Sequence, residues 1–415
     1  MKTWITYLAA AAMGLSATLL FGETVAFQQA MYIISTLLVQ FGGLIFIPLV
    51  FFGFAAGTAS LRKDGMGGTL VGTTILWSLI TTAFLAAIGA VVFKLLPSAF
   101  PATSTAGANA SMMSGIGIGS FSRIISGVFQ QNPFYTLAVS DGFLLPVIFI
   151  AAIFGYAIKP NVEVIRPAYV VMNSFSEVMF RLAHIFTRIG YLFIAIFSAS
   201  WFAMLWKDGT VFVAIPFMIT FLTSVAVVIL VILPLLYAFF TKFKRNPYRD
   251  LYRLLSPALA GLFSGNLLFA GPSLVASARH NLGAQKRVAG TAVPLYTLIG
   301  RGGSALIATV SVCALLQAAM GTAPQWSVVF AVAAMCAAVS FGSSLNIGYE
   351  VLFISVVAVR FLDLNLYGAE MTLLGLLPLL NGAGVLIDVL VGGLGASASC
   401  EIMGTAAPSP YKDII

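Results

Sequence analysis

Three ionisable residues lie deep inside apolar segments of the chain: Arg301, Glu350 and Asp388. A charge in the middle of a membrane segment is costly unless it is paired or faces water, so each is a functional candidate. Arg301 stands within "GRGGS" (300–304), whose three glycines weaken the helix. We expect Arg301 to face a substrate or ion site. A structural pair between Arg301 and Asp388 would leave the same pattern in the sequence.

Two further segments carry polar residues near their centres. Residues 255–283 are broken by "SGN" and "AGPS", and residues 326–362 are broken by "SFGSSLNIG". Two short apolar arms about a polar tip are typical of a re-entrant helical hairpin, whose freed backbone groups bind carboxylates or cations. Any single serine there could instead only allow close packing. The candidate ligands at the two tips are Ser264, Asn266, Ser343, Ser344 and Asn346.

Enzyme signatures are absent from the sequence, which contains no HExxH, GxSxG or CxxC pattern. Neither His184 nor His280 lies near a likely nucleophile, and we expect His280 to be solvated within a basic segment. The three cysteines lack metal-ligand spacing and are expected to be small core residues. We therefore predict a protein that is not an enzyme, with no cofactor and no metal beyond a possible sodium ion.

The composition indicates a polytopic helical membrane protein. Of 415 residues, 60% are hydrophobic and 8% are charged, against about 25% charged in soluble domains. The net charge of +8 does not indicate a nucleic-acid partner, because basic clusters alternate with charge-poor loops as the positive-inside rule requires. We expect a multi-pass protein of a bacterial inner (plasma) membrane, in contact with lipids and with both termini in the cytoplasm.

The order of segments indicates an inverted-repeat transporter. Each expected hairpin precedes a helix with an expected interruption, at 300–304 and at 381–388, and this layout is typical of a site at mid-membrane. We expect an extracellular flexible linker at 98–125. Glu177 and Arg181, four residues apart, are expected to form a helix-surface pair. The expected membrane spans are roughly 4–21, 31–60, 67–97, 134–158, 168–206, 211–241, 290–320 and 371–403.

Two stretches resemble the dicarboxylate/amino acid:cation symporters, the glutamate-transporter-like family: "LIFIPLVFFGFAAGTASL" (44–61) and "NPFYTLAVSDGFLLPVIFIAAIFGYAI" (132–158). The resemblance covers nearly the whole chain. It implies a homotrimer with eight all-α transmembrane helices and two re-entrant hairpins. It also implies a static scaffold of spans 1, 2, 4 and 5 and a transport unit that moves as an elevator. The scaffold would comprise 1–62 and 126–206, and the transport unit 63–97 and 207–408.

The chain departs from the family pattern where ligands bind, and so resembles a divergent member. The family's "NMDGT" reads "GRGGS" here, so its cation-ligand positions become Gly300 and Gly302, and its Thr becomes Ser304. The family's Asp for a substrate amine aligns with Asn381, and its Asn for the substrate backbone aligns with Asp388. By resemblance, these positions join the candidate substrate and cation ligands.

We hypothesise a transporter of a small organic anion, of the dicarboxylate or amino acid class, in which Arg301 attracts the carboxylate directly or through Asp388. Because the guanidinium occupies the family's cation motif, it could replace an ion and weaken sodium dependence. An alternative is proton-coupled transport with Asp388 or Glu350 as the carrier, since a buried carboxyl group can hold a proton near neutral pH. Another alternative is an uncoupled anion-conducting or structural membrane protein of the same fold.

Overall fold

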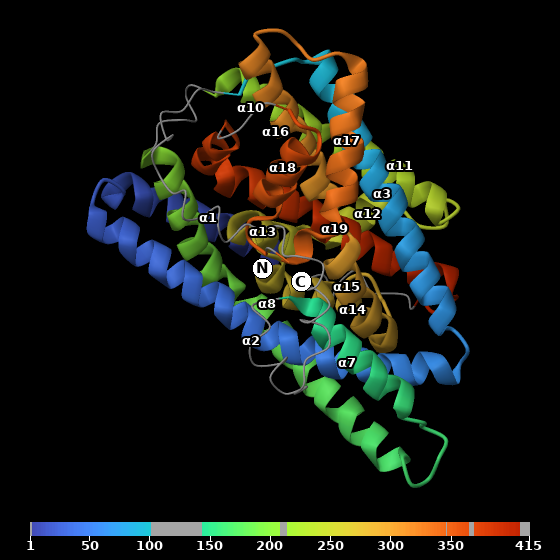
Figure 1. The fold of residues 1–415 in the computed structure, drawn as a ribbon. Coiled ribbons are helices and arrows are strands. Elements are labelled where there is room, and N and C mark those ends of the chain that lie inside the picture. Colours follow the sequence, from blue (N-terminus) through green and yellow to red (C-terminus); the bar gives the residue numbers. More distant parts are fainter. Residues whose placement is uncertain (1, 101–142, 208–213, 346, 365–368, 407–415) are drawn as a thin grey trace.

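The structure is a computed structural model that describes residues 2–100, 143–207, 214–345, 347–364 and 369–406 (Figure 1). Within these residues every regular element is helical. The expected linker at 98–125 lies outside the described residues from residue 101 onward. The all-α expectation is therefore met wherever the chain is described.

Seven helical stretches in the described part of the chain are long and apolar enough to cross a membrane. The stretch over 215–240 contains one π-helical turn, and the stretch over 286–320 is interrupted near its middle. These stretches are formed by α1 (Thr3–Phe21), α2 (Val25–Lys63), α3 (Gly67–Leu95), α8 (Arg166–Lys207), α10–η1–α11 (Ile215–Val227, Val228–Ile232, Leu233–Phe240), α15–α16 (Lys286–Ile299, Gly302–Met320) and η3–α19 (Ala369–Leu376, Leu377–Ile402).

The remaining helices are shorter. The expected fourth span corresponds to α7, whose 14 described residues are too few to cross a bilayer upright. The eight-span count therefore stays a prediction, because residues 134–142 lie outside the description. The shorter helices are α7 (Leu144–Ala157), α12 (Pro247–Arg253), α13 (Leu255–Ser264), α14 (Leu267–His280), α17 (Trp326–Ser340), η2 (Ser343–Leu345) and α18 (Glu350–Phe361).

The two expected hairpins each form a pair of contacting helices. Helices α13 and α14 contact each other and are joined at Gly265 and Asn266, while α17 and α18 contact each other around a tip that contains η2. Gly265 adopts φ +58°, a left-handed conformation that favours glycine and ends α13. The interruptions "SGN" and "SFGSSLNIG" therefore mark helix ends, whereas the break expected at "AGPS" is wrong, because α14 continues through it with Pro272 inside the helix. Re-entry from opposite membrane faces remains a prediction.

The interruption expected in the last helix is also wrong. Helix α19 runs without a break through 381–388, where "NGAG" was expected to interrupt it. The glycines there serve close packing instead, because a Cβ on Gly382 would lie 2.3 Å from the Leu262 carbonyl oxygen of α13. A helix tolerates such glycines when neighbouring helices approach closely.

The helices pack into two groups that meet along α14 and α15. Helix α8 contacts α1 and α2, and α2 also contacts α7. On the other side α3, α16 and α17 contact one another, with α19 against α13, α15 and α16 (Figure 1). Helices α14 and α15 also contact α2. In the most apolar 18-residue segment of each stretch, 78% is buried for α15–α16 and for η3–α19, but only 28% for α1. The interrupted helix and α19 therefore form the centre, where a buried polar site can be built.

Candidate functional site

The break between α15 and α16 is capped by Asp388 of α19. Helix α15 ends at Ile299, and the amides at the start of α16 lack helical partners. Asp388 Oδ1 accepts hydrogen bonds from the Gly303 amide (2.6 Å) and the Ser304 amide (3.3 Å), and Oδ2 accepts one from Ser304 Oγ (2.6 Å). A carboxylate is favoured at a helix N-terminus by these amides and by the helix dipole.

The approach of α19 to the break requires a glycine. A Cβ on Gly303 would lie 2.4 Å from the Gly384 carbonyl oxygen, so a larger residue would push the two helices apart. Gly300 and Gly302 flank Arg301 and offer no side-chain ligand for a cation. The glycines of "GRGGS" therefore bring the Asp388 carboxylate onto the start of α16.

Arg301 pairs with Glu350, not with Asp388. Its Nη1 lies 3.3 Å from Glu350 Oε1, and the side chains are 1% and 0% exposed. The alternative considered above, a structural pair between Arg301 and Asp388, is therefore wrong, since both Asp388 oxygens accept from the start of α16. The physical reason is that Glu350 is the first residue of α18, which enters the centre from the second hairpin tip. A buried pair of this kind needs further hydrogen bonds to offset desolvation.

Glu350 and Asn381 supply those hydrogen bonds and join the two hairpin tips. Glu350 Oε2 accepts from the Gly348 amide (2.9 Å) and from Asn381 Nδ2 (3.0 Å). The same Asn381 Nδ2 donates to the Gly265 carbonyl oxygen (2.7 Å) at the first tip, and Asn381 Oδ1 accepts from the Val351 amide (3.3 Å). One carboxamide therefore connects the α13–α14 tip to the start of α18.

The polar side chains at the tips mainly form hydrogen bonds with backbone groups of their own hairpin. Ser264 Oγ donates to the Ala260 carbonyl oxygen (2.6 Å) within α13, and Asn266 Oδ1 caps α14 by accepting from the Leu268 amide (2.8 Å). Ser343 Oγ donates to the Ser340 carbonyl oxygen (2.7 Å). Ser343 and Ser344 are buried, and Asn346 lies outside the described residues.

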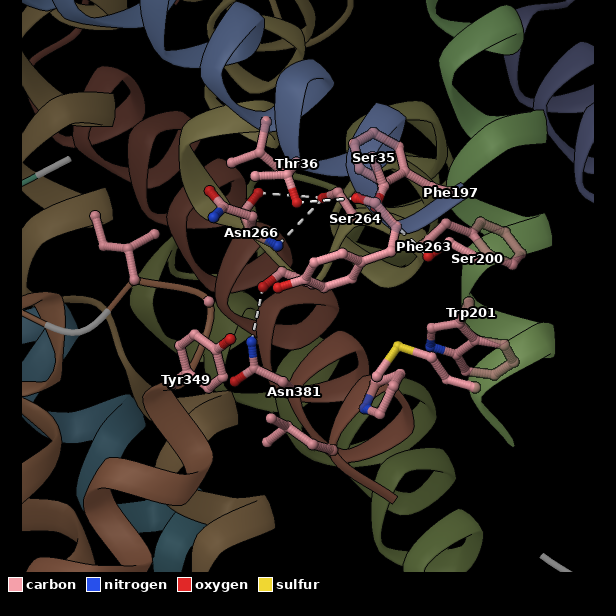
Figure 2. Close-up of a pocket in the computed structure, with 18 residues that line it drawn as sticks. Ser35, Thr36, Phe197, Ser200, Trp201, Phe263, Ser264, Asn266, Tyr349 and Asn381 are labelled. Carbon is pink, nitrogen blue, oxygen red and sulfur yellow. Dashed lines mark hydrogen bonds between the residues drawn. The ribbon is translucent and has the colours of Figure 1, made fainter. Parts of the chain in front are cut away.

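A cavity of about 320 Å³ borders both tips (Figure 2). The structure brings Ser264, Asn266 and Asn381 to its wall, whereas Arg301, Glu350, Asp388 and Ser304 do not line it. Gly348 and Asn381, which both donate to Glu350, separate the buried pair from the cavity. The wall is completed by side chains of α2 and α8 that sequence reasoning missed: Tyr32, Ser35, Thr36, Phe197, Ser200, Trp201 and Met204.

The missed residues had only a weak signal in the sequence. Ser35 and Thr36 are adjacent hydroxyl residues in an apolar run, as are several other pairs in the sequence, and both hydroxyls donate to the Tyr32 carbonyl oxygen as helical serines and threonines often do. Neither charge nor helix interruption marks Ser200 and Trp201. Their place at the cavity depends on how α2 and α8 pack against the tips.

Two expectations for residues near the junction of α14 and α15 need correction. Glu177 pairs with Arg279 (3.1 Å) and Lys286 (3.3 Å) rather than with Arg181, because α14 and α15 bring these cations against α8. The His280 ring packs 4.8 Å from the ring of His184 and is partly buried, not fully solvated. The expectation for the cysteines is confirmed, since Cys313, Cys336 and Cys400 are all buried and unpaired with one another.

The membrane-length helices, the interrupted helix and the buried polar centre define an integral membrane transporter. The sequence model of the sodium:dicarboxylate symporter family matches residues 3–391 of the 415. The chain therefore belongs to the sodium:dicarboxylate symporter family, as the resemblance indicated. This family consists of transporters, which agrees with a protein that is not an enzyme. A search of curated proteins finds no match to the chain.

Proposed function

We propose that this protein is a secondary active transporter of a small organic anion, in which the buried Arg301–Glu350 pair takes the place of a bound cation. The observation that carries the proposal is the 3.3 Å contact between a guanidinium and a carboxylate that are both almost fully buried. In a membrane protein such charges mark substrate or ion pathways. The family supplies the transport class.

The packing supports a division into two units. In this proposal α1, α2, α7 and α8 are the scaffold, and α3, α10–α11 and α13–α19 form a transport unit that moves as an elevator within a homotrimer of the inner membrane. The cavity is lined from both units, by α2 and α8 on one side and by the hairpin tips and α19 on the other. Movement of one unit would therefore change access to the cavity.

Sodium coupling is weak or absent in this proposal. Gly300 and Gly302 carry no ligand oxygen on a side chain, and Asp388 already accepts three hydrogen bonds from Gly303 and Ser304. The positive charge that a cation would bring to the break is already present on Arg301. Because this charge is covalently fixed, the two tips can be held together without an ion.

The charges of the centre favour proton coupling as a second candidate. Arg301 and Glu350 neutralise each other, whereas Asp388 has hydrogen-bond donors but no cationic side-chain partner among the described residues. An ionised buried carboxylate without a counter-ion is costly, and a proton removes that cost. Asp388 would then be the proton carrier, and Glu350 the permanent partner of Arg301.

Uptake into proteoliposomes tests the proposal. Labelled organic anions are offered under a sodium gradient, a proton gradient or neither, with counterflow against internal substrate. We expect counterflow and little sodium stimulation, and stimulation by an inward proton gradient if Asp388 is the carrier. Strong, saturable sodium stimulation would contradict replacement of the ion. A steady current without counterflow would instead favour an uncoupled anion-conducting protein.

Variants of the pair sharpen this test. Arg301→Met alone is expected to abolish uptake, but it also leaves Glu350 unpaired and can prevent folding. The double variant Arg301→Met/Glu350→Gln removes both charges and serves as the folding control. If that double variant folds and transports at the wild-type rate, the pair has no role in transport.

A further inference from the structure

The described residues that line the cavity carry no charged side chain, although two carboxylates lie close behind its wall. Glu350 is 0% exposed, and its oxygens accept from Arg301, Gly348 and Asn381. Asp388 is 2% exposed and is held by the start of α16. Neither carboxylate can therefore reach a cationic group on a ligand without losing its own partners.

The carboxamide and Gly265 carbonyl oxygens at the wall already accept hydrogen bonds, so the other side-chain acceptors there are neutral hydroxyls, which stabilise an ammonium ion less than a carboxylate does. Asn381 Oδ1 accepts from the Val351 amide, Asn266 Oδ1 accepts from the Leu268 amide, and the Gly265 carbonyl oxygen accepts from Asn381 Nδ2. An ammonium group loses its hydrogen bonds to water when it enters a cavity. Burying it without strong acceptors costs more free energy than the other ligand contacts supply. The wall is thus poorly suited to an amine.

Hydrogen-bond donors, in contrast, are available. Asn266 lines the cavity, and its Nδ2 donates to no described residue. Two tyrosine hydroxyls, on Tyr32 and Tyr349, also line the cavity. Unpaired donors suit a ligand that offers acceptors, such as a carboxylate with a neighbouring hydroxyl or carbonyl oxygen.

A second carboxylate on the ligand would lack a cation. Arg301 is the only guanidinium or ammonium group at the centre in the described residues, and Glu350 already neutralises it. The opposite wall instead presents aromatic rings from Phe197, Trp201 and Phe263 (Figure 2). Such rings bury the apolar part of a ligand.

We infer that the cavity selects a monocarboxylate that lacks an amine and has an apolar, ring-sized remainder, such as an aromatic hydroxy or oxo acid. This inference rests on the proposed transport function and narrows its substrate class. One negative charge meets unpaired donors, the apolar remainder meets aromatic rings, and no further ionised group is accommodated. The engaged Asn381 carboxamide is the specificity-determining residue, because it presents a neutral group at the wall where a carboxylate would pair with an amine.

Three compounds that differ at one position test the inference on the purified full-length protein. Phenyllactate carries a hydroxyl next to its carboxylate, phenylalanine has an ammonium there, and benzylmalonate has a second carboxylate. Calorimetric titration is expected to show phenyllactate binding at least about tenfold more tightly than either analogue, a difference of about 1.4 kcal/mol. Equal or tighter binding of phenylalanine or benzylmalonate would overturn the inference.

A second measurement separates this inference from the proposed function. If none of the three compounds binds but proteoliposomes take up aspartate or succinate, the inference is wrong and the transport function stands. If no organic anion of any class is bound or exchanged, the transport function fails, and the inference fails with it.

Asn381→Asp tests the residue assigned to specificity. A carboxylate at this position adds an acceptor at the wall, and we expect the preference for phenyllactate over phenylalanine to fall by about tenfold or more. Asn173→Asp is the matched control, because Asn173 lies away from the cavity and its Oδ1 accepts from Lys286 Nζ (2.9 Å), a contact that a carboxylate keeps. An unchanged preference in folded Asn381→Asp would refute the role of Asn381.

Discussion

Two sets of ion pairs in the described part of the chain differ in their access to water. At the centre, Arg301 and Glu350 are 1% and 0% exposed. Near the junction of α14 and α15, Glu177 is 34% exposed, and its partners Arg279 and Lys286 are 26% and 23% exposed. Arg287 and Asp64 form a similar half-exposed pair between α15 and the end of α2. Similar chemical groups therefore interact in very different surroundings.

This difference in exposure indicates where a charge can have a functional role. A half-exposed pair gives little free energy, because water and salt compete with it. A fully buried charge must keep its partner, so the partner's state controls the surrounding structure. The Arg301–Glu350 pair is attached through Asn381 to both hairpin tips. The partly exposed pairs of Glu177 and Asp64 only join neighbouring helices. The following predictions test this contrast.

The largest effect is expected from removing one member of the buried pair. Arg301→Met leaves Glu350 buried without a counter-charge, so the free energy of unfolding should fall by about 3–5 kcal/mol. The double variant Arg301→Met/Glu350→Gln should lose clearly less, because no unpaired charge remains. Unfolding of the purified protein in detergent measures both. Glu350→Gln alone completes the cycle: if the loss in the double variant equals the sum of the two single-variant losses, the residues are not coupled.

A smaller loss is expected at the cap of α16. Asp388→Asn replaces a charged acceptor with an amide, so the bonds from Gly303 and Ser304 should weaken by about 1.5–3 kcal/mol. The same unfolding assay measures this loss, with Ser304→Ala as a control that removes only the hydroxyl donor. If Asp388 carries the coupling proton, uptake by a folded Asp388→Asn variant should also become independent of a pH gradient. Retained pH-gradient stimulation would exclude Asp388 as the carrier.

The smallest effect on stability is expected for the partly exposed ion pairs of Glu177. Glu177→Gln should lower the free energy of unfolding by about 0.2–1 kcal/mol at low salt, and the loss should shrink at high salt. Glu163→Gln is the charge-matched control, since Glu163 is exposed in the turn before α8. A salt-independent loss as large as that of Arg301→Met would remove the contrast between the two regions.

The sequence predicted which charged residues lie at the centre, but not which of them form the ion pair. Arg301, Glu350 and Asp388 stand out because each is a rare charge in an apolar segment. Which carboxylate pairs with Arg301 could not be read from that pattern, because Glu350 and Asp388 are both acidic and both distant in sequence. The choice depends on α18 starting at Glu350 and on α19 approaching α16 through Gly303 and Gly384.

Glycine gave opposite outcomes in two similar segments. "GRGGS" was predicted to interrupt a helix and does so, since α15 ends at Ile299 and α16 begins at Gly302. "NGAG" at 381–384 was also predicted to interrupt a helix, yet α19 continues through it. Glycine lowers helix stability in both segments, but close contact with neighbouring helices can outweigh that cost. Sequence alone cannot report those neighbours.

The sequence by itself determined the class of this protein, because a chain with 60% hydrophobic and 8% charged residues must satisfy its backbone within apolar helices. It also determined where most helices end, because Gly, Ser and Asn interrupt apolar periodicity locally. Only the tertiary structure decided which carboxylate neutralises Arg301, that Asn381 joins the two tips, and that α2 and α8 complete the cavity. These contacts form between residues far apart in the chain, so their geometry depends on helix packing rather than on local composition.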